Sequence, residues 1–217
     1  MDAFADQLPA NMSPDLIATF LTALLDRDLD GDGDIDAATC GRLTDGLVAA
    51  ALHLAQTHLT PPGSRPGDFA LCAVGGYGRG EMAPQSDVDL LFLAPRRITA
   101  DLETLIETVL YVLWDLRLKV GHSSRTIKQC LKLGSEDYTI RTALLEMRYL
   151  TGNRPLAKEL ENRLWAELFH GTERDFVEAK LAERDHVAQV VRLPKLEHGL
   201  AGTRKIVARI LRIFGQE

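Results

Sequence analysis

Apolar residues recur three and four positions apart in three stretches of the first half of the chain, which predicts a helix in each. The stretches are residues 13–26, 39–58 and 99–117. Ser13 and Pro14 suit the start of the first helix, because a serine side chain caps free backbone N–H groups and proline has none to satisfy. The pattern therefore indicates several amphipathic helices.

Short apolar runs lie between these helices and predict strands. Phe69–Val74 and Val88–Leu93 are such runs, and Asp89 alone interrupts the second. A third strand is expected from Leu118 to Ser124, and the proline- and glycine-rich residues 61–68 form a loop. The order of strand, glycine turn, strand, long helix and strand predicts a small mixed sheet in an α/β (α+β) core.

The chain beyond Thr126 is expected to be mostly helical. The breaks fall at Gly134, 151–153 and Gly171, and the clearest late helices span 156–169 and 175–191. We therefore predict three parts, namely an N-terminal helical segment (1–62), the sheet-bearing core (63–135) and a C-terminal helical extension (136–217).

Composition narrows the class of protein. The 217 residues include 46% hydrophobic and 26% charged residues, which is ordinary globular usage. No apolar run is long enough to span a bilayer, and the acidic start lacks the features of a signal peptide, so we expect a cytoplasmic protein. The net charge of −6 argues against nucleic-acid binding through a basic surface, and three scattered cysteines argue against a disulfide scaffold.

Two aspartates interrupt the second strand run, and their spacing is chemically informative. Residues two apart in a strand point to the same face, so Asp87 and Asp89 would present two carboxylates together, with Val88 and Leu90 buried on the other side. Two close carboxylates repel each other unless a cation neutralises them. Mg²⁺ (or Mn²⁺) suits such a pair, because it prefers carboxylate oxygens together with substrate phosphates.

The preceding glycine-rich turn supplies a complementary feature. Gly75 and Gly76 let the backbone approach a ligand and expose successive N–H groups to an anion, and Arg79 adds a positive charge. Turn and carboxylates together predict a site for a metal-bound nucleoside triphosphate. The segment is not a P-loop, since no Gly-Lys-Ser/Thr follows, and it leads to a strand rather than to the helix of a Rossmann fingerprint.

The segment GGYGRGEMAPQSDVDLLFL resembles the signature of the DNA polymerase β-type nucleotidyltransferase superfamily, and more narrowly that of the PII uridylyltransferase family. The resemblance continues through YVLWDLRLKVGHSSRT, YTIRTALLEMRYLTGN and FVEAKLAERD, which together cover most of residues 70–185. It implies an enzyme that transfers UMP from UTP to a tyrosine of the PII nitrogen-signalling protein and releases pyrophosphate.

The resemblance also implies roles for particular residues. Asp87 and Asp89 would be catalytic and hold the metal, and Glu146 is the best candidate for the third acidic residue usual in the superfamily, with a surface charge as the alternative. The nucleotide-binding residues implied are Gly75, Gly76, Arg79, Ser86, Ser123 and Arg125. Ser123 and Arg125 equally fit a second interpretation, in which they only cap the following helix.

Two departures from the family pattern leave alternatives open. The segment PKLEHGLAGTRK (194–205) keeps only some family positions, and the HD hydrolase and ACT sensor domains of the full enzyme do not fit before Glu217. We therefore expect neither uridylyl removal nor glutamine sensing within this chain. The alternatives are a nucleotidyltransferase with another acceptor or nucleotide, and a non-catalytic module that binds PII or a nucleotide.

An aspartate-rich break (DLDGDGDIDAAT, 28–39) resembles a calcium loop in part. Its acidic positions are Asp28, Asp30, Asp32 and Asp36, but Thr39 stands where such a loop has a bidentate glutamate. Aspartate–glycine runs also make ordinary polar turns. Calcium binding here is therefore a secondary hypothesis.

Overall fold

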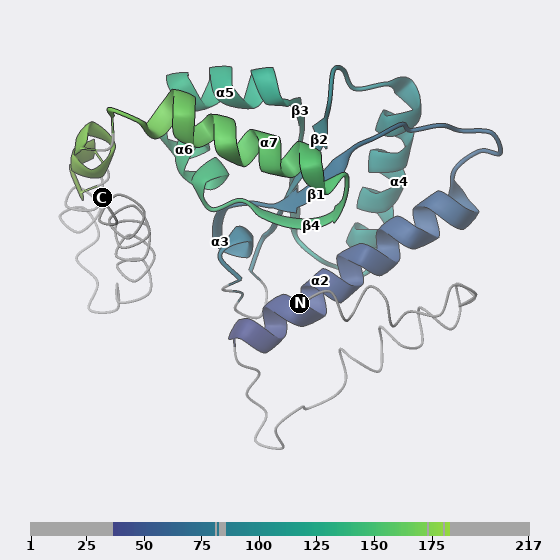
Figure 1. Ribbon diagram of the computed structural model, residues 1–217. Coiled ribbons are helices and arrows are strands. Elements are labelled where there is room, and N and C mark those ends of the chain that lie inside the picture. Colours follow the sequence, from purple (N-terminus) through teal and green to yellow (C-terminus); the bar gives the residue numbers. More distant parts are fainter. Residues whose placement is uncertain (1–36, 81, 83–85, 173, 180, 183–217) are drawn as a thin grey trace, which may run out of the picture.

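A four-stranded mixed sheet lies between two layers of helices in the computed structural model, which describes residues 37–80, 82, 86–172, 174–179 and 181–182 (Figure 1). The strands are β1 (Ala70–Ala73), β2 (Val88–Ala94), β3 (Val120–Thr126) and β4 (Arg148–Gly152), in the order β3-β2-β1-β4. The α/β class with a small mixed sheet is therefore confirmed.

The two central strands carry the segment with the glycine turn and the aspartates. β1 pairs antiparallel with both β2 and β4, whereas β2 and β3 run parallel. A parallel pair needs a crossover connection, and helix α4 (Ala100–Asp115) provides it. The parallel register sets Asp89 opposite Gly121, Leu91 opposite Ser123, and Leu93 opposite Arg125.

One face of the sheet packs against α2 (Ala37–Leu54), the π-helical turn that follows it (Ala55–Leu59) and α4. Helix α4 buries the residues that its apolar periodicity indicated, namely Leu102, Leu105, Ile106, Val109, Leu110 and Leu113. The Thr99 hydroxyl caps its first turn by accepting a hydrogen bond from the Leu102 N–H, at 3.2 Å. The predicted helices 39–58 and 99–117 are thus confirmed to within a few residues.

The opposite face packs against α5 (Ile127–Glu136), α6 (Tyr138–Leu145), α7 (Arg154–Leu164) and the π-helical turn Trp165–Phe169 (Figure 1). Polar side chains define where these helices begin. Thr126 and Gln129 form a reciprocal capping box at α5, Asp137 caps α6, and Asn153 caps α7. Helix α6 is the element that later forms one wall of the candidate site.

Two expectations for the second half of the chain were wrong. β4 was not anticipated, because five residues at a sheet edge, four half-buried and Gly152 exposed, carry too short a pattern to distinguish from the helices on either side. Gly134 does not end a helix but lies inside α5. A Cβ there would meet Leu168 Cδ1 at 2.8 Å, so the glycine permits close helix packing instead.

Several predicted segments lie outside the described residues. They are the helix 13–26, the aspartate-rich break with Asp28, Asp30, Asp32 and Asp36, and the segment 194–205. Of the predicted helix 175–191, residues 175–179 and 181–182 are described and helical. None of the helices formed by the described residues is long and apolar enough to cross a membrane.

Candidate active site

The glycine-rich turn forms a single helical turn, α3 (Gly75–Gly78), directly after β1. Gly75 has φ +59°, a left-handed backbone conformation that residues other than glycine rarely adopt. Its neighbour Val74 is extended and donates its N–H to the carbonyl oxygen of Asp89 at 3.0 Å. The turn is therefore fastened directly to the strand that carries the aspartates.

The Asp89 carboxylate lies between two glycines, Gly75 at the start of α3 and Gly121 in β3. A Cβ on Gly75 would meet Asp89 Oδ2 at 3.3 Å, and a Cβ on Gly121 would lie only 2.5 Å from Asp89 Oδ1. Gly121 comes from β3 and is the register partner of Asp89. Both oxygens thus occupy space that exists because neither neighbour has a side chain.

The alternation predicted for this strand is confirmed. Val88 and Leu90 are buried in the core shared with α2 and α4, whereas Asp89 is half-buried on the opposite face. Asp87 directly precedes the strand and is exposed. Burial, and to a lesser degree the charge of Asp87, raises the pKa of the Asp89 carboxyl above its ordinary value.

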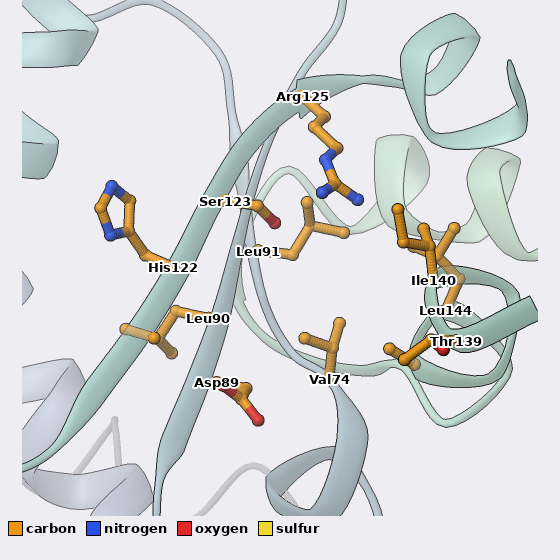
Figure 2. Close-up of a pocket in the computed structure, with 12 residues that line it drawn as sticks. Val74, Asp89, Leu90, Leu91, His122, Ser123, Arg125, Thr139, Ile140 and Leu144 are labelled. Atoms are coloured by element: carbon orange, nitrogen blue, oxygen red, sulfur yellow. The ribbon is translucent and has the colours of Figure 1, made fainter. Parts of the chain in front are cut away.

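A pocket of about 330 Å³ runs from Asp89 along the sheet to Arg125. Figure 2 shows the order of the polar side chains, with Asp89 at one end, Ser123 in the middle and Arg125 at the other end. Arg125 lies four residues beyond Gly121 on β3, which corresponds to about 13 Å of strand. The pocket is therefore long enough for an elongated ligand.

The opposite wall of this pocket is helix α6. Thr139, Ile140 and Leu144 project from it toward β2 and β3, and Ala143 shares the same helical face (Figure 2). His122 and Leu90, by contrast, point to the other side of the sheet. An apolar wall that faces polar groups is the usual construction of a small-molecule site.

Arg79 and Glu146 contact each other, which neither predicted role anticipated. Arg79 NH1 donates to Glu146 Oε1 at 2.6 Å, and the Glu146 side chain is only 4% exposed. Glu146 ends α6, and its backbone packs so closely on Gly78 that no Cβ fits there. The pair therefore ties the glycine turn to the helix that walls the pocket.

The remaining predicted residues lie around the same place. Gly76 lies in α3, where a Cβ would approach an Arg79 guanidinium nitrogen at 3.6 Å. Ser86 is half-buried immediately before Asp87. Ser123 and Arg125 line the pocket, whereas the capping of α5 is carried out by Thr126.

Sequence reasoning did not identify Gly121 or the α6 wall. A signal for Gly121 was available, because a glycine inside a predicted strand often marks a close approach by another group. No signal was available for the wall, since the residues of α6 read as an ordinary amphipathic helix. Their role follows from the packing of α6 against β2 and β3.

The donor set at this end of the pocket suits a magnesium ion. Within the part of the chain that the structure describes, no three His, Cys, Asp or Glu side chains gather to hold a metal. Glu146 Oε1 pairs with Arg79, and the metal-binding role predicted for Glu146 stays a prediction. Mg²⁺ commonly uses one or two carboxylates and completes its coordination with water and substrate phosphates, so the two aspartates fit.

Comparison with known proteins decides the family. Residues 63–150 match the model of the nucleotidyltransferase domain, a span that includes β1, the glycine turn, both aspartates and the pocket. These residues form a nucleotidyltransferase domain. The family and the transferase class predicted from the sequence are confirmed, and nucleotidyltransferases generally use a nucleoside triphosphate and a divalent metal ion.

Curated proteins similar to this chain carry the name bifunctional uridylyltransferase/uridylyl-removing enzyme. The chain is 54% identical over 174 residues to the protein from Ruegeria pomeroyi, which is 76% of this chain and 19% of that one. It is 56% identical over 173 residues to that from Cereibacter sphaeroides, covering 76% and 18%. It thus spans about a fifth of the length of these relatives.

The raised pKa of Asp89 in this nucleotidyltransferase predicts a pH-dependent stability. An acid whose pKa is higher in the folded state favours folding below its unfolded pKa, and that contribution is lost as the pH rises through the folded pKa. The Asp89→Asn variant should therefore melt at a higher temperature than the wild type at pH 7.5, in metal-free buffer. The difference should shrink as the pH falls toward 4. Thermal melts of both proteins across this range measure it, and parallel curves would contradict it.

Proposed function

We propose that this chain transfers UMP from UTP to a tyrosine hydroxyl of the PII signalling protein, in the cytoplasm, with Mg²⁺ as the metal. The observation that carries the proposal is the Asp89 carboxylate, placed between Gly75 and Gly121 at one end of a pocket of nucleotide length. The names of the relatives, which are 54% and 56% identical, support uridylyl as the group transferred.

Each part of the pocket has a role in this proposal. The backbone N–H groups of Gly75 and Gly76 receive the triphosphate, with Ser86 and the Arg79 guanidinium close by. Ser123 and Arg125 contact the nucleotide farther along β3, and its apolar parts pack on α6. Glu146 is given no metal-binding role in this proposal, because its carboxylate already forms an ion pair with the Arg79 guanidinium.

The two aspartates set the electrostatics of the reaction. Asp87 and Asp89 would hold Mg²⁺, which when bound neutralises negative charge on the phosphates. The tyrosine oxygen attacks the α-phosphorus, the bond from that phosphorus to the α–β bridging oxygen breaks, and pyrophosphate leaves, while the hydroxyl proton passes to solvent water. The chain contributes orientation and charge, and Asp87 itself is exposed.

The test is incorporation of label from α-³²P-UTP into purified PII, with Mg²⁺. We expect one UMP per acceptor tyrosine and none in a PII variant with phenylalanine at that tyrosine. ATP, CTP and GTP should label PII at least about tenfold more slowly. Pyrophosphate release with another acceptor would favour a related nucleotidyltransferase, and nucleotide binding without turnover would favour a non-catalytic module.

A further inference from the structure

Tyr77, in the middle of the glycine turn, is fully buried, although its neighbours Gly75 and Gly76 are half-exposed. Its hydroxyl donates to Asp45 Oδ1 on α2 at 2.7 Å. Burial and the adjacent Asp45 charge raise the pKa of this hydroxyl, so it remains a neutral donor. The turn is thereby joined to a helix that lies before the matched nucleotidyltransferase residues in the sequence.

Arg148 on β4 completes this connection with a single guanidinium. NH1 and NH2 donate to the two Asp45 carboxylate oxygens at 2.7 and 3.0 Å. NH2 also donates to the Tyr77 carbonyl at 3.2 Å, and Nε donates to the Gly78 carbonyl at 3.3 Å. The guanidinium also lies 5.4 Å from the centre of the Tyr77 ring.

The contacts meet a specific need of this turn. A helix of four residues is too short to be stable by itself, and its last carbonyls have no partners within the helix. Arg148 donates to the Gly78 carbonyl and gives the Tyr77 carbonyl, which already accepts from the Gly80 N–H at 3.0 Å, a second hydrogen bond, while Tyr77 fills the space beneath. The direction in which the Gly75 and Gly76 N–H groups point is therefore set from the other end of α3.

We propose that Arg148 and Asp45 are positioning residues, which act through Tyr77 to hold the glycine turn in the orientation that receives the triphosphate. The inference rests on the proposed function, since it assigns the turn to a nucleotide. The side chains of Arg148 and Asp45 are about one-third exposed, at 34% and 33%, so their ion pair contributes little to overall stability. The geometry of the contacts, rather than their strength, is what the site uses.

The test measures nucleotide affinity separately from transfer. Arg148→Lys keeps the charge but loses the bidentate geometry and the two carbonyl contacts. We expect it to weaken binding of a non-hydrolysable UTP analogue with Mg²⁺, measured by calorimetry, by about 10- to 100-fold, with the KM for UTP raised and the KM for PII unchanged. Asp45→Asn should have a similar effect, and the double variant should be little worse than either alone.

A matched control is available on α7. Arg163 pairs with Glu167 at 2.7 Å on the surface, so Arg163→Lys makes the same chemical change at another ion pair and should leave analogue binding unaltered. If Arg148→Lys and Asp45→Asn bind the analogue like the wild type, the inference fails while the proposed function stands. If the folded wild type does not bind the analogue at all, both the proposed function and this inference fail.

Discussion

Asp89→Asn is expected to abolish UMP transfer, with a fall in kcat/KM of about three orders of magnitude or more. The amide keeps the size of the side chain but removes the charge that would hold the metal between Gly75 and Gly121. The fold should persist, because replacing a half-buried carboxylate removes a burial cost. Labelling of PII measures the activity, and circular dichroism measures the fold.

Glu107→Gln is the matched control for this variant. Glu107 lies on the exposed face of α4, so the same carboxylate-to-amide change occurs away from the pocket and should leave transfer unaltered. Mg²⁺ should raise the thermal midpoint of the wild type in the presence of UTP, and much less that of Asp89→Asn. Transfer by Asp89→Asn at more than about a tenth of the wild-type rate would show that this carboxylate is not part of the metal site.

Gly121→Ala is expected to reduce transfer by about 100-fold while costing little stability. The new Cβ would lie 2.5 Å from Asp89 Oδ1, a distance that real Cβ atoms do not tolerate. The carboxylate is the end of a side chain and can rotate aside, whereas the paired β2 and β3 backbones cannot. The methyl group should therefore displace the Asp89 carboxylate and leave the fold intact.

The same substitution at Gly46 provides the comparison. Nothing lies within 4 Å of a Cβ at Gly46, which is inside α2, so Gly46→Ala should stabilise the protein by about 0.5–1 kcal/mol and leave transfer unaltered. Chemical denaturation and the labelling assay measure both quantities. Full activity in Gly121→Ala would mean that Asp89 can move freely without harm to the site.

The sequence predicted three of the four strands, and the face of β2 on which Asp89 lies, because their signals are local. Leu90 and Asp89 alternate within one strand, and the apolar face of α4 repeats over four turns. One buried apolar residue beside one polar residue is sufficient to assign the two faces of a strand. By the same reasoning, the glycine turn could be recognised as a flexible connection beside a carboxylate pair.

The contacts that shape the site could not be predicted, because they join distant parts of the sequence. Arg79 was expected to bind phosphate and Glu146 to bind metal, and no pattern in the sequence showed that they pair. Tyr77, Asp45 and Arg148 read separately as a turn aromatic and two surface charges. Only the packing of α2 and β4 beside α3 brings them together.

The position of Asp89 between β1 and β3 has a consequence for how the protein folds. Gly75 lies close to Asp89 in the sequence and follows β1. Gly121 contacts Asp89 only after α4 has packed against the sheet and β3 has paired with β2. Parallel pairing of this kind is slow, because a long loop must close before any contact compensates for its lost entropy. A partly folded chain therefore lacks one side of the proposed metal site, and if Asp89 holds the metal, ion affinity should appear in the last kinetic phase of refolding.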